Sequence, residues 1–401
     1  MFRGLNDFEL RTKNDQKIAL FIEELPGLEK IIDMGPETHP TWMELDPSAL
    51  MDNVGEIRRS IGDGVKIIAS VKANAYGHGI EPVGQVLSQA GVEMLATGSF
   101  AEAVALRDAG VKTPILLLAG ALPNALGDVV ARGFIPTIYD MDGARAVDNV
   151  AKVTAPVFVK VDCGLGRLGI PLDEAPNLLR QVTSLTNVKL QGLYTHLSFK
   201  DSDGMAYAQQ RLALFYELVT NLRAGGLDIP VTQAIASSAL VLGWSDGCSA
   251  VCPGHILFGL NSLESEMTDD FPYRPALRAV KSRVIQVRNH DTGPAMGSGG
   301  YHRSRRERRT AVAPCGLNDG YAPPGPGQDA FVLHQGRELR VVGVSLEHIT
   351  VELPDEVACK TGDELTIAGQ TITLDRLAQW QERRPIDVML SFSGRLPVVL
   401  S

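Results

Sequence analysis

The stretch SVKANAYGHG, Ser70–Gly79, follows a short apolar run and predicts a strand that ends in a lysine and a glycine-containing turn. Lys72 falls at the carboxyl end of this strand, and Tyr76 and His78 follow it. A lysine buried at a strand end loses solvation, so its pKa falls and it can form a Schiff base with an aldehyde. A strand-end lysine is more often a surface group, so the other strand ends decide its role.

Short apolar or β-branched runs recur along the chain, and amphipathic stretches of helical period separate them. Such alternation predicts a parallel sheet, and eight repeats favour a closed barrel over an open doubly wound sheet. We therefore predict an α/β fold with a (β/α)8 TIM-like barrel over residues 40–272. The runs end near Ala73, Ser99, Gly120, Tyr139, Cys163, Leu197, Ala236 and Cys252, and predicted helices include Pro47–Ile61 with Asp46 as N-cap, Phe100–Ala109 and Tyr207–Ala224.

The pattern changes after about residue 272 to alternating strands interrupted by Gly and Pro. Examples are ALRAVKSRVIQVR, RRTAVAPCG, AFVLHQG, LRVVGVSL, HITVEL and ELTIAG. We predict a smaller C-terminal β-rich domain over residues 273–401. Residues 1–39 form an N-terminal extension, in which Asp15–Glu24 has a helical pattern.

Composition limits the partners of the chain. A net charge of −9 at pH 7 argues against a nucleic-acid surface, because phosphate binding needs concentrated basic side chains. The five cysteines form no CxxC pair and are odd in number, so neither a disulfide framework nor a metal site is predicted. No apolar run approaches the ~20 residues that cross a bilayer. We expect a small-molecule substrate, no membrane partner and a cytoplasmic location.

Several chemically distinctive residues fall at equivalent places in the repeat. They are Arg167 after the fifth strand, His196 at the end of the sixth, Ser237 and Ser238 after the seventh, and Cys252 and Gly254 after the eighth. Taken singly, the arginine could be an ion-pair partner, the histidine a core residue and the serines a helix cap. Barrel enzymes, however, build their sites at the carboxyl ends of the strands and bind phosphate after strands seven and eight. Together with Lys72 these residues predict a site for pyridoxal 5′-phosphate (PLP).

The motif around Lys72 resembles the PLP-lysine motif of the alanine racemase family, which are fold-type III PLP enzymes. The similarity covers roughly residues 40–400 and starts at TWMELDPSALMDNV. In FVKVDCGLGRLGI, it implies that Lys160 can be carbamylated and steadies Arg167, which meets the substrate carboxylate. In LQGLYTHLS, it implies that His196 packs beside the cofactor ring.

The same resemblance assigns a phosphate-binding group. Tyr76 and Ser238, the latter in ASSAL, match residues that reach the phosphate, and His78 is interpreted as structural. CPGHILFG matches an Arg-Pro-Gly segment whose backbone amides, here those of Gly254 and His255, bind phosphate. Cys252 then replaces an arginine that faces the pyridine nitrogen, and a neutral thiol is only a weak donor there.

The chain also departs from the family at the second catalytic base. The racemases use a tyrosine of the partner subunit, but in AMGSGGYHRSRRERR its position falls on Ser298, and Tyr301 is three residues late. Serine is too weak a base without an activator, so either Tyr301 or His302 takes the role or the second base is absent. Near the substrate entrance, Leu346 and Glu347 stand where the family has Met-Asp.

Two catalytic hypotheses and one non-catalytic hypothesis remain open. The chain could racemise an alanine- or serine-like amino acid, or it could make or break a Cα–Cβ bond as an aldolase or tetrahydrofolate-dependent hydroxymethyltransferase. The arginine-rich run Arg303–Arg309 is either a solvated loop or a clamp for an anionic cosubstrate such as tetrahydrofolate. A non-catalytic PLP carrier is the third hypothesis. The resemblance implies a homodimer with shared active sites.

Overall fold

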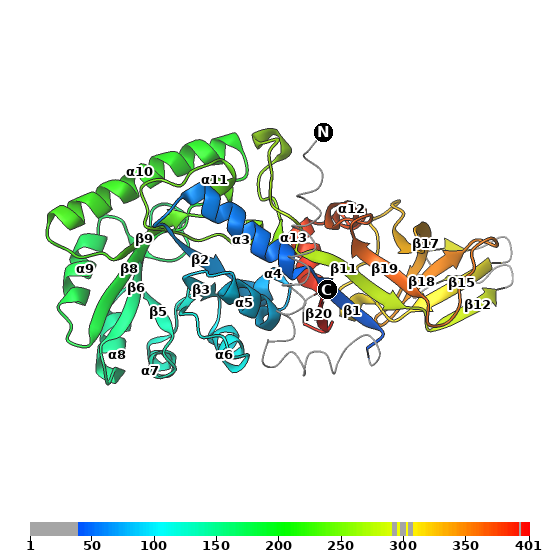
Figure 1. The fold of residues 1–401 in the computed structure, drawn as a ribbon, viewed down its shortest axis with the longest axis horizontal. Helices are drawn as coiled ribbons and strands as arrows, with labels where there is room; N and C mark the ends of the chain where they lie inside the picture. Colours follow the sequence, from blue (N-terminus) through cyan, green and yellow to red (C-terminus); the bar gives the residue numbers. More distant parts are fainter. Residues whose placement is uncertain (1–38, 291–294, 297–301, 304–307, 393) are drawn as a thin grey trace, which may run out of the picture. The chain divides into compact units, whose positions relative to one another are not determined.

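The computed structural model describes residues 39–401 except 291–294, 297–301, 304–307 and 393 (Figure 1). The chain divides into two compact units, Ala49–Ala276 and a second unit that joins Leu277–Ser401 to the residues up to Ser48. Strand β1 (Thr41–Leu45) lies in the range that we expected to belong to the barrel, but it pairs with strands of the second unit.

The first unit is a closed barrel of eight parallel strands. The strand order is β5-β4-β3-β2-β10-β9-β8-β6, and pairing of β5 with β6 closes the ring. The predicted (β/α)8 barrel is therefore confirmed. The strands are β2 (Lys66–Ser70), β3 (Met94–Thr97), β4 (Ile115–Leu117), β5 (Ile135–Ile138), β6 (Ala155–Asp162), β8 (Val188–Tyr194), β9 (Val231–Ile235) and β10 (Ala250–Val251), and β7 (Ile170–Pro171) is a short addition to β6.

Capping side chains decide where several helices of the barrel begin. Helix α3 (Pro47–Ile61) has the predicted bounds, and the Asp46 carboxylate accepts the N–H of Ser48 at 2.8 Å. Helix α10 (Ser202–Ala224) begins earlier than the predicted Tyr207, because Asp201 caps it. Helices surround the strands (Figure 1): α5 (Ile80–Gln89), α6 (Phe100–Asp108), α7 (Leu126–Ala131), α8 (Met141–Val150), α9 (Ala175–Thr183) and α10.

Side chains from all eight strands fill the barrel. Phe158 is fully buried, and Gly192 leaves space for its ring, because a Cβ at this position would collide with that ring. The Tyr194 hydroxyl lies 2.9 Å from that of Thr137. The cluster comprises Ile68, Met94, Ala96, Leu116, Ile135, Phe158, Tyr194, Val231 and Ala250, with Leu118 and Cys252 packed against it. The barrel is thus a packed core, and ligands can reach only the ends of its strands.

The second unit is dominated by a sheet of order β12-β15-β18-β17-β16-β19-β11-β1-β20, antiparallel except for the parallel pair β1–β20. The predicted β-rich domain is confirmed. Its strands are β11 (Leu277–Arg283), β12 (Gln286–His290), β15 (Arg308–Ala313), β16 (Phe331–His334), β17 (Arg337–Val344), β18 (Ile349–Leu353), β19 (Glu364–Gly369) and β20 (Val398–Leu400), and a separate pair comprises β13 (Ala295–Met296) and β14 (His302–Arg303). Helices α12 (Leu374–Trp380) and α13 (Pro385–Phe392), which the strand pattern did not predict, precede β20.

Two further features bear on the sequence analysis. None of the helices in the described residues is long and apolar enough to cross a membrane. All five cysteines lie in the described part of the chain and have free thiols.

Candidate active site

Lys72 opens a left-handed turn, α4 (Lys72–Tyr76), directly after strand β2. The φ angles of Ala73, Asn74, Ala75 and Tyr76 are 56°, 53°, 54° and 54°. This left-handed conformation costs a non-glycine residue ~1–2 kcal/mol. Strain of this kind persists only where surrounding contacts enforce it, and it concentrates at functional sites. The backbone thus marks the Lys72 turn independently of its sequence motif.

The Glu102 carboxylate anchors this turn to helix α6. One oxygen accepts the N–H of Asn74 at 2.8 Å, and the other accepts those of Gly98 and Ser99 at 2.9 and 3.1 Å. The side-chain oxygen of Asn74 accepts the N–H of Ile80 at 2.8 Å. Glu102 belongs to no catalytic motif in the sequence, although its spacing from Ser99 is that of a capping box.

Replacing Glu102 with glutamine should loosen the Lys72 turn, because an amide offers one acceptor oxygen in place of two charged ones. Hydrogen bonds to charged groups contribute ~1.5–3 kcal/mol each, so we expect cofactor retention to weaken by ~10–100-fold. Cofactor dissociation followed by visible absorbance measures this change. Glu81→Gln, an exposed carboxylate at the start of α5, is the matched control. Unchanged retention in Glu102→Gln would contradict the anchoring role.

Three basic side chains lie close enough in the barrel unit to affect one another's charge. Burial, followed by the positive charges of Arg167 and Lys72, lowers the pKa of Lys160 to about 8. Burial also lowers the pKa of Lys72, and Arg167 adds to this effect. Both lysines therefore have a larger neutral fraction at neutral pH than an exposed lysine, as a nucleophile or a base requires. The same cluster of positive charge attracts anions.

Arg167 lies on a loop that Asp162 shapes. The Asp162 carboxylate accepts the N–H groups of Gly164 and Gly166 at 2.8 and 2.9 Å. Burial raises the pKa of Asp162, but these backbone hydrogen bonds outweigh it and the net pKa is lowered. The Arg167 side chain is exposed and forms no ion pair with a carboxylate of the described residues. The loop therefore presents a guanidinium that is available to an anionic ligand.

His196 and Cys252 are both uncharged at neutral pH. Burial, together with the charges of Lys72, Lys160 and Arg167, lowers the pKa of His196 to about 3. Burial raises the pKa of the Cys252 thiol to about 11, against the effect of the two lysines. His196 can thus donate only one hydrogen bond and accept one. Cys252 adds no positive charge, unlike the arginine of the family pattern.

A group of polar side chains lies after strands β9 and β10. The hydroxyls of Ser238 and Ser262 lie 3.1 Å apart, and the Gly254 N–H donates to the Ser237 hydroxyl at 2.9 Å. A Cβ at Gly254 would collide with the Tyr76 hydroxyl, so glycine lets this hydroxyl approach the backbone. Ser262 was missed by the sequence analysis because nothing in its local motif marks it. The hydroxyls of Tyr76, Ser238 and Ser262 are groups that can bind a phosphate.

Two histidines follow the Lys72 turn and strand β10, and each packs against an aromatic ring. The ring of His255 meets that of Tyr76 edge-on at 5.0 Å between centroids. His78 is fully buried and stacks on Phe258 at 4.5 Å, and burial lowers its pKa to about 4. This packing supports the structural interpretation of His78.

Models of two protein domains match nearly the whole chain. The N-terminal domain of alanine racemase matches residues 45–262, and the C-terminal domain of alanine racemase matches residues 277–400. This chain belongs to the alanine racemase family.

Individual members of the family resemble the chain along most of its length. The alanine racemase of Halothermothrix orenii is 30% identical over 368 residues, which cover 90% of this chain and 96% of the relative. The solved alanine racemase of Clostridium difficile 630 superposes with a TM-score of 0.85 at 26% identity, covering 91% and 96% of the two chains. A histidine racemase of Leuconostoc mesenteroides shares the fold, with a TM-score of 0.80 at 23% identity and coverage of 90% and 98%.

The family's second base cannot be traced in the structure. Ser298 and Tyr301 lie outside the described residues, and only the backbone of His302 is described, in β14. The assignment of a base opposite Lys72 therefore stays a prediction.

Leu346 and Glu347, the predicted substrate-entrance residues, lie in the second unit. The Leu346 side chain is 69% exposed. Glu347 accepts a hydrogen bond from Asn318 at 3.1 Å and pairs with Arg395 at 3.3 Å. Gly394 adopts a φ of 105° beside Arg395. The glutamate is thus held by a local ion pair within its own unit.

The arginine-rich run is partly absorbed into the sheet. Arg308 and Arg309 belong to β15, where Arg308 lies 3.4 Å from Glu352 and Arg309 donates to the carbonyl of Val357. Arg305 and Arg306 lie outside the described residues. Two of the five arginines therefore already have partners, which weakens the clamp hypothesis.

Proposed function

We propose that this chain racemises a small amino acid, with alanine as the first candidate, and that PLP is held on Lys72. Family membership supports PLP-dependent racemase chemistry. The observation that supports the site most directly is the cluster of Lys72, Lys160 and Arg167, in which burial and the charge of Arg167 lower the pKa of both lysines. A histidine racemase shares the fold, so the fold alone does not select the amino acid.

The residues of the barrel unit fit PLP on two counts. An aldehyde needs a nucleophilic amine, and the lowered pKa of Lys72 supplies one. A phosphate needs hydroxyl and backbone donors, and Tyr76, Ser238, Ser262 and the segment beginning at Gly254 offer them. When bound, PLP supplies an electron sink for the electron pair left after proton removal from Cα.

The chain's own groups divide the remaining work. Lys72 would hold the cofactor through its aldehyde, and its Nζ, once the substrate amine has displaced it, would carry a proton to and from Cα. The Arg167 guanidinium binds the substrate carboxylate through paired hydrogen bonds. The neutral His196 orients its neighbours through single hydrogen bonds and adds no charge. Lys160, with a pKa of about 8, has enough neutral amine to react with carbon dioxide, and the resulting carbamate would accept hydrogen bonds from Arg167.

Cys252 distinguishes this site from the family pattern. Its thiol has a pKa of about 11 and is neutral at physiological pH, whereas an arginine would repel a proton from the pyridine nitrogen. We infer that the ring nitrogen is protonated more readily here than beside an arginine. Tyr301 or His302 remains the proposed second base, in a homodimer whose partner closes each barrel mouth against water.

Incubation of L-alanine and D-alanine, separately, with PLP-loaded protein in D₂O tests the proposal. We expect each enantiomer to exchange its Cα proton and to convert to the other, as followed by mass spectrometry and chiral chromatography. Serine provides a second substrate of similar size.

Three outcomes separate the proposed function from its alternatives. Exchange of one enantiomer with retention, and product formation only after addition of an aldehyde or a one-carbon tetrahydrofolate donor, would indicate the aldolase or hydroxymethyltransferase hypothesis. The racemases named above give that hypothesis and its tetrahydrofolate cosubstrate no support. A bound cofactor whose absorbance no amino acid changes would indicate a carrier. If alanine and serine keep both their handedness and their Cα protons, racemisation of small amino acids is contradicted.

A further inference from the structure

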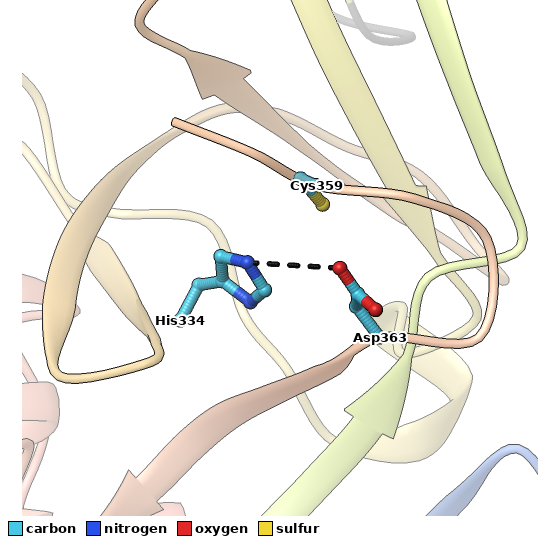
Figure 2. A group of neighbouring side chains, drawn as sticks. All are labelled: His334, Cys359 and Asp363. Atoms are coloured by element: carbon cyan, nitrogen blue, oxygen red, sulfur yellow. Dashed lines mark ion pairs between the residues drawn. The ribbon is translucent and has the colours of Figure 1, made fainter. Parts of the chain in front are cut away.

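We propose that His334, Cys359 and Asp363 in the second unit form a binding site for a divalent metal ion of the Zn²⁺ class. One ring nitrogen, the thiol sulfur and one carboxylate oxygen all lie within 4.8 Å of one another. Figure 2 shows the three side chains facing a common space. No metal site is predicted from the sequence, because these residues do not have the spacing of a known metal motif.

Two neighbouring strands bring the ligands together. His334 ends strand β16, and Cys359 and Asp363 flank the turn that leads into β19. The Asp363 carboxylate accepts the N–H of Lys360 at 3.0 Å, and Gly362 completes the turn with a φ of 94°. This hydrogen bond leaves the second carboxylate oxygen, and further lone pairs of the first, free to bind a cation. The turn therefore holds thiol and carboxylate on the side that faces the histidine.

The separations suit a small tetrahedral ion. The Nε2 atom of His334 lies 3.8 Å from Oδ2 of Asp363. Two ligands that each bind Zn²⁺ at ~2.1 Å in a tetrahedral site are ~3.4 Å apart. Closing this pair requires movement of only a few tenths of an ångström, and the sulfur lies within 4.8 Å. Rotation of the side chains can bring the atoms this much closer without a change in the backbone.

The hydrogen bonding of His334 gives an independent reason to expect a cation. Its Nδ1 lies 3.2 Å from the carbonyl oxygen of Glu364, and its Nε2 lies 3.1 Å from that of Ala358. A neutral imidazole has one N–H, so one of these nitrogens directs a lone pair at a carbonyl oxygen. If Nδ1–H donates to Glu364, the Nε2 lone pair faces the Ala358 carbonyl oxygen at 3.1 Å, with Oδ2 of Asp363 3.8 Å away, and a cation between these groups would remove the repulsion of lone pair and carbonyl. Histidines that bind metals commonly donate their other N–H to a backbone carbonyl in this way.

The donor set selects the class of ion. Imidazole nitrogen, thiolate sulfur and carboxylate oxygen together suit Zn²⁺ or Co²⁺, whereas Mg²⁺ and Ca²⁺ prefer oxygen ligands alone. The thiolate is the form of cysteine that binds metals, so binding of the ion releases the thiol proton to solvent. Three protein ligands leave a fourth position for water, and the ion would tie the β16–β17 hairpin to the β19 turn.

Titration of metal-stripped, full-length, PLP-loaded protein with Co²⁺ tests the site. We expect one ion per chain and a near-ultraviolet thiolate-to-Co²⁺ absorbance band. Cys359→Ser should lose the band, and Asp363→Asn, whose amide oxygen can still accept the Lys360 N–H, should bind at least ~10-fold more weakly. Zn²⁺ should raise the unfolding temperature of the unaltered chain and leave that of Cys359→Ser unchanged.

Matched controls are Cys248→Ser, a cysteine of the barrel unit, and Asp355→Asn, an exposed aspartate of the second unit, and both should bind Co²⁺ as the unaltered chain does. Circular dichroism of each variant without metal separates lost binding from lost folding. Absence of Co²⁺ binding, or a thiolate band that persists in Cys359→Ser, would overturn the proposal. Because the readouts are binding and unfolding, they do not depend on the racemase proposal.

Discussion

Replacing Lys72 with alanine is expected to abolish covalent cofactor binding and to lower the racemisation rate by ~10⁴-fold or more, because one side chain supplies both the nucleophile and a base. The substitution removes a partly buried side chain but leaves the backbone contacts of Glu102 in place, so the fold should persist. Borohydride reduction followed by peptide mass spectrometry measures tethering directly, and chiral chromatography measures the rate.

Lys66→Ala is the matched control for this prediction. Lys66 is exposed at the amino end of strand β2, the same strand that Lys72 follows. Its replacement should leave cofactor tethering and turnover unchanged. A borohydride-fixed cofactor in Lys72→Ala, or its attachment to Lys160 in the unaltered chain, would show that the tethering lysine has been assigned incorrectly.

Replacing Arg167 with alanine should have the second largest effect, mainly on substrate binding. Truncating one partner of a hydrogen-bonded charge pair costs ~2–5 kcal/mol, so kcat/KM should fall by about 10²-fold or more, chiefly through KM. Arg167→Lys should recover only part of this loss, because an ammonium cannot form the paired hydrogen bonds of a guanidinium. Steady-state kinetics with alanine at several concentrations measures both parameters.

The same substitution should also change the pKa of Lys160. Removal of the Arg167 charge should raise this pKa, which the charge now lowers. Arg180→Ala, an exposed arginine of helix α9, is the control and should change neither KM nor the pKa of Lys160. If Arg167→Ala lowered kcat with KM unchanged, the guanidinium would be acting on the reaction step rather than on substrate binding.

The barrel could be predicted from local sequence because parallel strands that are buried on both faces appear as short apolar runs. Arg167, His196 and Ser238 follow the ends of such runs. They could be predicted to lie at one rim, since all carboxyl ends of the strands in a parallel barrel lie at the same rim. Helix α3 was predicted with its bounds because Asp46 is a local capping signal. Each of these signals lies within a few residues of the feature it predicts.

Other features depend on contacts between residues that are distant in sequence. Strand β1 pairs with β11, as Thr41 with Ser282, and no local pattern distinguishes such a strand from one of the barrel. Glu102 supports the Lys72 turn from the next repeat. His334 meets Cys359 and Asp363 because β16 pairs with β19. Pairings over such separations depend on the folded sheet rather than on sequence periodicity.

The sequence by itself determined the alternation of strands and helices, the place of Lys72 at a strand end and the departures at Ser298 and Cys252. Only the tertiary structure decided the left-handed turn that presents Lys72, the neutral state of His196 and the lowered pKa values of Lys72 and Lys160. The physical reason is that residue types and periodicity are local properties. Desolvation, charge repulsion and enforced backbone strain arise only when distant segments pack together.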